Sequence, residues 1–369
     1  MKIGILGGGQ LGRMLIQNAL KYDDEFFTLD PAADAPCHNI SHFTQGSFND
    51  YDAVLNFGKD KDVVTIEIEH VNADALEQLE KDGVKVIPNS KIIKTIQQKI
   101  LQKEFYKAHD IPSPDFEIKW KGDDPIFMSL PFVQKMNIGG YDGKGVQVIR
   151  TEEDYHQLWD ADSVLESLVD INKELSVIVA KNERGETKIF PVTEMVADPK
   201  LYLLDFNICP TELSEDVQSQ IEAITHKFLA AVDSPGLFAI ELFLDQQGKV
   251  WVNETAPRLH NSGHQSQEGN ANSQFEQMYR VVTNAPLADT DACGYSGMLN
   301  LVGAEGFSGK VIYEGLDEVL KLPKTYVHLY GKTETKPGRK MGHINVLADS
   351  KEELMKKLIQ IKEIVVVKA

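Results

Sequence analysis

Cysteine is scarce in this chain. Its 369 residues include three, Cys37, Cys209 and Cys293, and no two of them have the spacing of a zinc-binding or redox motif. A scaffold held together by disulfides is therefore not expected, and the chain is predicted to work in a reducing compartment, the cytoplasm.

Basic residues and long apolar runs are also few. Against 56 aspartates and glutamates the chain has 38 lysines and arginines, and its formal charge is −18. This balance disfavours nucleic acid as a partner, because phosphate backbones are bound by basic surfaces. No apolar run approaches a membrane span, and the first residues lead into glycines rather than a secretion signal. We expect a soluble protein with small-molecule ligands and two or three domains.

The stretch from residue 236 to residue 264 carries the most specific pattern. Residues 238–245 and 250–254 are rich in β-formers, and the glycine of the turn at 246–249 suits a hairpin. A loop closed symmetrically about that turn pairs Asp245 with Val250. Counting back along this register predicts that Glu241 lies directly opposite Glu254.

Two opposed carboxylates repel each other, so this hairpin needs a shared proton or a cation. Mg²⁺ is commonly held by one or two carboxylates and substrate phosphates, which predicts a metal and nucleotide site. The alternative is that the register slips or that one glutamate faces solvent. Asn253 precedes Glu254, and the polar loop at 256–264 that follows has the composition of a binding surface.

The N-terminus predicts a strand, a glycine turn and a helix. Gly7, Gly9 and Gly12 match a dinucleotide-binding fingerprint, with Asp30 near the distance of its ribose-binding acid. Taken alone this pattern indicates an NAD-dependent dehydrogenase, but any anion-binding turn at a helix N-terminus needs the same glycines. Glu67 ends a strand predicted at 63–68, where it is either a ligand contact or a solvated strand end.

Two further segments have the composition of anion sites. A strand at 131–137 carries Lys135 and leads into the glycine loop 138–146, which could wrap a phosphate or could be a plain hairpin loop. The glycine-bounded turn at 331–342 is basic within an acidic chain, and is either an anion site or a solvated loop. A helix is predicted at 92–109, with Lys99 and Lys103 one turn apart, a spacing that favours a solvated face over a binding site.

Four motifs give the chain a family resemblance. GGGQLGRM near the start, GGYDGKG in the middle, and NETAPRLHNSGH and YGKTETKPGRKMGH towards the end resemble those of 5-(carboxyamino)imidazole ribonucleotide synthetases, ATP-grasp ligases of purine biosynthesis. The resemblance implies ATP-dependent carboxylation of 5-aminoimidazole ribonucleotide with bicarbonate, giving ADP and phosphate through a carboxyphosphate intermediate. It also implies Mg²⁺ as cofactor and a homodimer.

The resemblance implies a mixed α/β and α+β architecture in three parts. Residues 1–92 would form a Rossmann-like domain that precedes the ATP-grasp fold. Residues 93–285 would form the ATP-grasp domain, with a mobile lid at about 115–166, and residues 286–369 a small β-rich domain.

The resemblance also implies roles for individual residues. Asp142 is expected to act as general base, with Arg258 and Lys332 as further catalytic residues, and Glu241 and Glu254 are expected to hold the metal. The expected ATP contacts are Lys99, Lys135, Gly140, Tyr141, Asp142, Gly143, Lys144, Gly145, Val146, Glu166, Ser167, Leu168, Val169, Glu174, Asn253 and Glu254. The expected substrate contacts are Gln10, Glu67, Tyr141, Lys144, Arg258, His260, Asn261, Ser262, Lys332, Arg339 and Lys340.

Some positions depart from the family pattern. Lys99 stands where the family has an arginine, and Asn137, Ile138 and Val146 replace other side chains at the nucleotide site. Ala197 stands where the family has a histidine, so that contact is missing. The rival interpretations are a related ATP-grasp enzyme such as a formate-dependent glycinamide ribonucleotide formyltransferase, a dehydrogenase, and a catalytically silent regulatory module.

Overall fold

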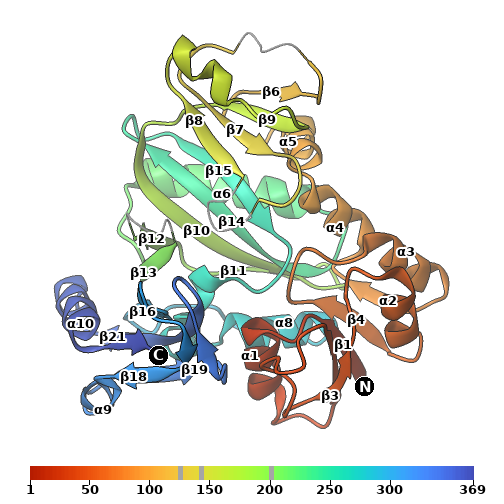
Figure 1. The fold of residues 1–369 in the computed structure, drawn as a ribbon, viewed down its shortest axis with the longest axis vertical. Helices are drawn as coiled ribbons and strands as arrows, with labels where there is room; N and C mark the ends of the chain where they lie inside the picture. The colour runs from red at the N-terminus through yellow and green to blue at the C-terminus, as the bar shows by residue number, and fades with distance from the viewer. Residues whose placement is uncertain (124–127, 141–144, 199–202) are drawn as a thin grey trace.

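The computed structural model describes residues 1–123, 128–140, 145–198 and 203–369. Figure 1 shows a small sheet at the top, an N-terminal layer at the lower right and the C-terminal elements at the lower left. A long sheet connects the upper and lower parts. Within the described ranges, no helix has both the length and the apolar character needed to cross a membrane.

The N-terminal region is a parallel sheet with helices packed against it. Its strand order is β3-β2-β1-β4-β5, so β1 lies at the centre between β2 and β4. Buried residues of β1 such as Ile3 and Leu6 belong to two different apolar clusters, as expected for a sheet covered on both faces. The elements are β1 (Lys2–Leu6), α1 (Gln10–Ala19), β2 (Glu25–Asp30), β3 (His42–Gln45), α2 (Tyr51–Gly58), β4 (Val63–Ile66), α3 (Ala73–Lys81) and β5 (Lys85–Ile87).

The predicted helix at 92–109 is two helices, α4 (Ser90–Gln97) and α5 (Lys99–Ala108). Gln98 between them has an extended backbone. Asn137 caps the new helix start, since its backbone carbonyl accepts from Lys99 N at 3.0 Å and its side-chain oxygen accepts from Ile100 N at 3.0 Å. Lys99 is therefore fixed at the first position of α5 by a residue that departs from the family pattern.

Two sheets form the central part. A four-stranded sheet has the order β6-β9-β7-β8, and the long sheet runs β15-β14-β10-β12-β13-β16-β21-β19 with β11 beside β10. The central elements are β6 (Phe116–Lys119), β7 (Phe132–Met136), β8 (Val146–Ile149), η1 (Glu152–Gln157), β9 (Ser163–Ser167), β10 (Ile171–Lys181), β11 (Thr187–Ile189), β12 (Thr193–Ala197), β13 (Leu204–Cys209), α6 (Glu215–Ala231), β14 (Gly236–Asp245), β15 (Val250–Ala256), η2 (Asn261–Gly263), α7 (Ser266–Gly269) and α8 (Gln274–Val282).

The C-terminal part continues the long sheet and adds two separate two-stranded sheets. The pairing of β13 with β16 carries the sheet from the central part into the C-terminal part, with Phe206 opposite Leu299. The C-terminal elements are β16 (Tyr295–Val302), β17 (Gly309–Lys310), β18 (Ile312–Glu314), α9 (Leu316–Val319), β19 (Thr325–Leu329), β20 (Glu334–Thr335), β21 (Lys340–Ala348), α10 (Lys351–Ile364) and β22 (Val366–Lys368).

A buried carboxylate joins the N-terminal layer to α8. Glu276 of α8 accepts hydrogen bonds from Tyr22 at 2.6 Å, Asn18 at 3.1 Å and Arg280 at 2.8 Å, and pairs with Lys21 at 2.8 Å. Burial alone would raise the pKa of Glu276, but these donors outweigh burial and lower the pKa to about 2. The ionised carboxylate therefore stabilises the contact between α1 and α8 at neutral pH.

We predict that Glu276→Gln lowers the free energy of unfolding by about 2–3 kcal/mol at pH 7, because hydrogen bonds to a charged acceptor are lost. The folded pKa lies below the unfolded value, so this stability is present above about pH 4.5 and is lost as the pH falls towards 2. Urea unfolding should therefore show the difference between wild type and variant shrinking at pH 3. The exposed Glu104→Gln should change little at either pH, and an equal loss in both variants would contradict the assignment.

Candidate active site

Glu241 of β14 lies directly opposite Glu254 of β15, as predicted. The predicted pairing of Asp245 with Val250 is wrong, because Leu244 pairs with Val250. A β-bulge at Asn253 adds one residue to β15 and restores the opposition of the two glutamates. The two departures from a regular hairpin compensate for each other at the glutamates.

Asp245 explains why the loop is not symmetric. Its side chain accepts from Gln247 N at 2.9 Å, Lys249 N at 2.8 Å and Trp251 Nε1 at 2.9 Å. Its own N–H donates to the Lys249 carbonyl at 3.0 Å. Because Asp245 closes the loop through its side chain, it pairs one position away from where a symmetric turn would place it.

Lysines from two other elements reach the bulged hairpin. Lys99 Nζ of α5 lies 2.6 Å from Glu254 Oε2, and Lys135 Nζ of β7 donates to Asn253 Oδ1 at 2.8 Å. The Asn253 amide makes a long contact of 3.5 Å with Glu241 Oε2. The bulge therefore lets consecutive residues, Asn253 and Glu254, both engage this site.

The Lys99 and Glu254 pair is ionised at neutral pH. Lys99 is the main cause that lowers the pKa of Glu254 to about 2. Burial alone would lower the pKa of Lys99, but Glu254 outweighs burial and raises it. The sequence analysis predicted that the opposed carboxylates would need a cation. In this structure the lysine side chains offset the charge of Glu254.

Glu166 is buried between two lysines beneath this hairpin. Its carboxylate lies 3.0 Å from Lys135 Nζ and 3.3 Å from Lys103 Nζ. Burial alone would raise the pKa of Glu166, but Lys135 and Lys103 outweigh it and lower the pKa. Ser167, Leu168 and Val169, further expected ATP contacts, are partly buried at the end of β9.

The predicted solvated face of the helix is wrong at Lys103. This lysine is 2% exposed, and burial is the main cause that lowers its pKa to about 8. The face of α5 that carries Lys99 and Lys103 packs towards β9 rather than towards water. The spacing of the two lysines alone could not reveal this, because the direction in which they point depends on the interruption of the helix at Gln98.

Glu174 of β10 is partly buried near the hairpin. Burial raises its pKa, and the neighbouring Glu241 raises it further. Glu174 is one of the expected ATP contacts.

The loop after β15 faces Glu241. His260 Nε2 lies 3.3 Å from Glu241 Oε1, and His260 Nδ1 lies 2.9 Å from Ser262 Oγ. Arg258 Nη2 pairs with Glu69 Oε1 at 3.1 Å. Among the described residues, the buried Arg258 Nε and both side-chain polar atoms of Asn261 have no hydrogen-bond partner. Buried polar atoms of this kind are expected to be satisfied by a ligand or water.

The N-terminal glycine turn holds a carboxylate of the protein itself. Glu67 accepts from Gly9 N at 2.8 Å and Gly12 N at 2.9 Å, and Asp30 accepts from Gly8 N at 2.8 Å. A Cβ on Gly9 would lie 2.4 Å from Glu67 Oε1, so glycine is needed for this approach. Because the anion position of the turn is filled, the fingerprint does not support NAD binding. Gln10, half-buried, begins α1 directly after the turn.

The basic turn lies beside this N-terminal site. Lys332 Nζ donates to the Lys340 carbonyl at 2.7 Å, and Arg339 donates to the Glu334 carbonyl at 2.7 Å. Burial is the main cause that lowers the pKa of Lys332 to about 8; nearby Arg339 and Lys340 lower it further, and Glu67 raises it. The electrostatic effect of Glu67 on Lys332 indicates that the basic turn lies near the glycine turn.

Arg13 is a cation that the sequence analysis did not single out. A Cβ on Gly331 would lie 3.4 Å from its guanidinium carbon, so Arg13 of α1 touches the basic turn. Its Nη1 donates to the Pro36 carbonyl at 2.7 Å, and its buried Nε has no partner among the described residues. The signal available was its place in the motif GGGQLGRM, one turn after Gly9.

The glycine loop is described only in part. Gly145 has a φ of +72°, and its carbonyl accepts from Met136 N at 2.9 Å as β7 turns into β8. Val146, 40% exposed, pairs with Lys135, and Gly140 ends the described range 128–140. The expected contacts Tyr141, Asp142, Gly143 and Lys144 lie outside the described residues.

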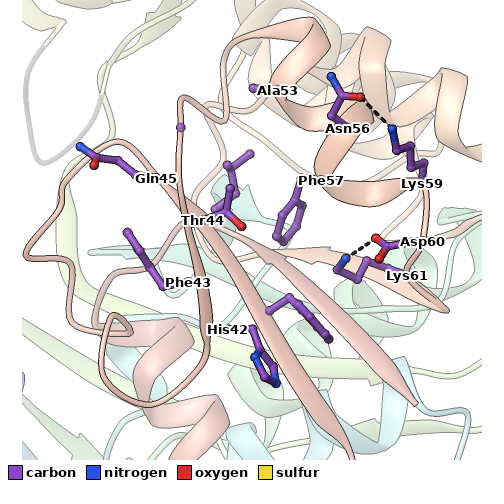
Figure 2. Close-up of a pocket in the computed structure, with 13 residues that line it drawn as sticks. His42, Phe43, Thr44, Gln45, Ala53, Asn56, Phe57, Lys59, Asp60 and Lys61 are labelled. Carbon is purple, nitrogen blue, oxygen red and sulfur yellow. Dashed lines mark hydrogen bonds and ion pairs between the residues drawn. The ribbon is translucent and has the colours of Figure 1, made fainter.

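A separate groove lies on the N-terminal layer, as Figure 2 shows. It is lined by β3 residues such as Phe43, by Phe57 and by Lys61, whose ammonium lies 4.3 Å from the Phe27 ring centre. None of its lining residues is an expected contact. This groove therefore does not coincide with the site formed by the hairpin, the loop after β15 and the basic turn.

Comparison with protein families divides the chain into three matched regions. Residues 1–97 match a ribonucleotide synthetase preATP-grasp domain, residues 104–275 an ATP-grasp domain, and residues 296–357 a phosphoribosylaminoimidazole carboxylase C-terminal domain. The ATP-grasp fold expected from the motifs is thereby confirmed.

Relatives match over nearly the whole chain. N5-carboxyaminoimidazole ribonucleotide synthase from Bacillus subtilis is 34% identical over 96% of this chain and 94% of its own length. The crystal structure of N5-carboxyaminoimidazole ribonucleotide synthetase from Thermotoga maritima superposes with a TM-score of 0.90 at 36% identity, covering 100% of this chain and 99% of its own.

A structure from Aspergillus clavatus, in complex with ADP and 5-aminoimidazole ribonucleotide, has a TM-score of 0.87 at 30% identity and covers 98% of both chains. The chain spans 68% and 64% of the length of the phosphoribosylaminoimidazole carboxylases of Ogataea methanolica and Vigna aconitifolia. The identity and the coverage of the bacterial relatives together establish that this chain belongs to the family of N5-carboxyaminoimidazole ribonucleotide synthases, ATP-dependent ligases with an ATP-grasp fold.

Proposed function

We propose that this chain carboxylates 5-aminoimidazole ribonucleotide with bicarbonate, using ATP and releasing ADP and phosphate. The observation that supports this most is the meeting of three regions. The hairpin contacts the loop after β15 where Glu241 meets His260. Arg258 of that loop and Lys332 of the basic turn both interact electrostatically with Glu67. The proposed nucleotide site and the proposed site for a phosphorylated second substrate would then be adjacent.

We propose Glu241 and Glu254 as ligands of Mg²⁺. Their hard oxygen atoms suit this ion, which is commonly held by one or two carboxylates together with substrate phosphates. In the described part of the chain, no group of three or more His, Cys, Asp or Glu side chains is arranged to hold a metal alone. Glu241 and Glu254 lie opposite each other across the hairpin, so both would reach one ion whose remaining ligands come from ATP. When bound, Mg²⁺ offsets charge on the transferring phosphoryl group.

The chain's own residues would bind and orient the substrates. Lys99 and Lys135 would face the phosphates of ATP, close to Glu254 and Asn253. Low exposure to water would strengthen the electrostatic attraction between these lysines and the phosphates. Arg258, Asn261 and the basic turn would hold the ribonucleotide. The unsatisfied Arg258 Nε and Asn261 amide supply donors for it.

The proposed reaction has two bond exchanges. A bicarbonate oxygen attacks the terminal phosphorus of ATP, ADP leaves, and carboxyphosphate forms. The substrate amine then forms the new carbon–nitrogen bond as phosphate departs, and Asp142 is the proposed acceptor of the amine proton. Positioning two reactants in one closed site would provide much of the rate. The homodimer and the cytoplasmic location stay predictions, and sedimentation would check the first.

The reaction itself can be tested directly. ADP release by the purified protein should need Mg²⁺ and should rise when 5-aminoimidazole ribonucleotide and bicarbonate are added together. Formate should not replace bicarbonate. A coupled ADP assay that runs faster with formate and glycinamide ribonucleotide would show that the chain is instead the formyltransferase of the rival interpretation.

Glu254→Gln should lower Mg²⁺-dependent turnover by about 10²–10³-fold, because one group that stabilises charge during transfer is lost. The matched variant Lys99→Gln breaks the same ion pair but keeps both carboxylates. It should raise the KM for ATP while keeping the Mg²⁺ dependence. Titration of turnover against Mg²⁺ separates the two variants, and identical Mg²⁺ profiles would contradict the ligand assignment.

Lys332 should give the substrate site a pH dependence. Its pKa of about 8 means that the free protein loses this positive charge as the pH rises above 8. The kcat/KM for 5-aminoimidazole ribonucleotide should therefore fall above about pH 8, since this constant reports ionisation in the free enzyme. Lys332→Arg should remove the fall, because arginine stays charged. A fall that persists unchanged in this variant would assign the ionisation to another group.

A further inference from the structure

A fully buried glutamine at the start of α8 holds the main chain of the loop after β15. Gln274 is 0% exposed. Its Oε1 accepts from the His260 N–H at 3.0 Å, and its Nε2 donates to the His260 carbonyl at 2.8 Å. One side-chain amide thus pairs with both main-chain groups of one residue, and this pairing dictates which end of the amide is oxygen.

The second amide hydrogen of Gln274 is also used. Gln274 Nε2 lies 3.0 Å from His264 Nδ1, so that nitrogen accepts and a neutral His264 carries its proton on Nε2. Burial lowers the pKa of His264, which keeps the ring neutral. The loop lies tightly against the amide, since a Cβ on Gly263 would be 2.8 Å from Gln274.

His260 is the residue through which Gln274 can influence the chemistry. Its ring lies 3.3 Å from Glu241, and its main chain has its two bonds to the buried amide. We infer that Gln274 is a positioning residue for the proposed reaction, holding His260 against Glu241 without touching either substrate. This inference rests on the proposed function, because His260 acts in that site.

Gln277, one turn further along α8, provides a matched control. It is also 0% exposed, and it pairs with both main-chain groups of Ala288 at 2.5 and 3.1 Å. The two glutamines share residue type, helix, burial and the pairing with both main-chain groups of one residue. They differ in that Gln277 holds a segment other than the loop after β15. A purely structural role would therefore give both residues the same effects.

The test compares Gln274→Met with Gln277→Met in the full-length protein. Both changes keep the side-chain length and remove the main-chain pairing, so both should lower Tm to a similar extent. Gln274→Met should also lower kcat by about 10–100-fold, as expected when a reacting group is slightly misplaced. Its Kd for ADP without metal should stay near the wild-type value, because Lys99, Lys135 and Glu166 lie on other elements.

Gln277→Met should keep wild-type kcat and ADP affinity. If both variants lose kcat equally, or if neither does, the positioning role is wrong. Should Gln274→Met fail to fold, Gln274→Glu gives a second measurement, because it keeps an acceptor for the His260 N–H but, when ionised, has no donor for the carbonyl. It should also lower kcat, and wild-type kcat in this variant would overturn the inference. An inactive wild type would instead refute the proposed function.

Discussion

The repulsion between Glu241 and Glu254 is the constraint on which the rest of the site depends. Two carboxylates directly opposed across a sheet must be offset by positive charge or by hydrogen-bond donors. Lys99 pairs with Glu254, while His260 and Asn253 face Glu241. These partners come from α5, from the loop after β15 and from the bulge. The arrangement of three separate segments therefore follows from one pair of like charges.

The local parts of this site could be predicted from the sequence, because their signals are local. The hairpin strands, the glycine loop and the basic turn each combine a characteristic composition with a bounded length. Helix α6 carries such local signals too: Ser214 caps its start, and Val217 and Phe228, three turns apart, are both buried. Short-range periodicity and turn chemistry are enough for such elements.

The burial of Lys103 and the contact of Arg13 could not be predicted, because each depends on distant packing. Asn137, directly after β7, caps α5, and this cap fixes the face that α5 presents to β9. Lys103 is therefore buried against Glu166, although its spacing from Lys99 is typical of a solvated face. Arg13 reaches Gly331 because the N-terminal and C-terminal parts meet. No local pattern contains that information.

The opposition of Glu241 and Glu254 is predicted correctly, although the predicted register of the hairpin is not. A symmetric loop places Glu241 opposite Glu254, but the loop is shifted by one residue because Asp245 bonds to the turn through its side chain. The bulge at Asn253 reverses the shift. The bulge also brings Asn253 to Lys135, which an unbulged strand could not do together with Glu254 facing Lys99.

The glycine turn at the N-terminus shows that a motif can keep its geometry while its ligand changes. Its free N–H groups bind an anion, as the fingerprint predicts, but the anion is the carboxylate of Glu67. This is possible because β4 lies beside β1 in the sheet, with Ile66 paired to Leu6, so the next residue reaches the turn. The turn then no longer offers a phosphate site. Positive charge beside the turn comes instead from Arg13 of α1 and, across the contact with the C-terminal part, from Lys332, whose pKa Glu67 raises.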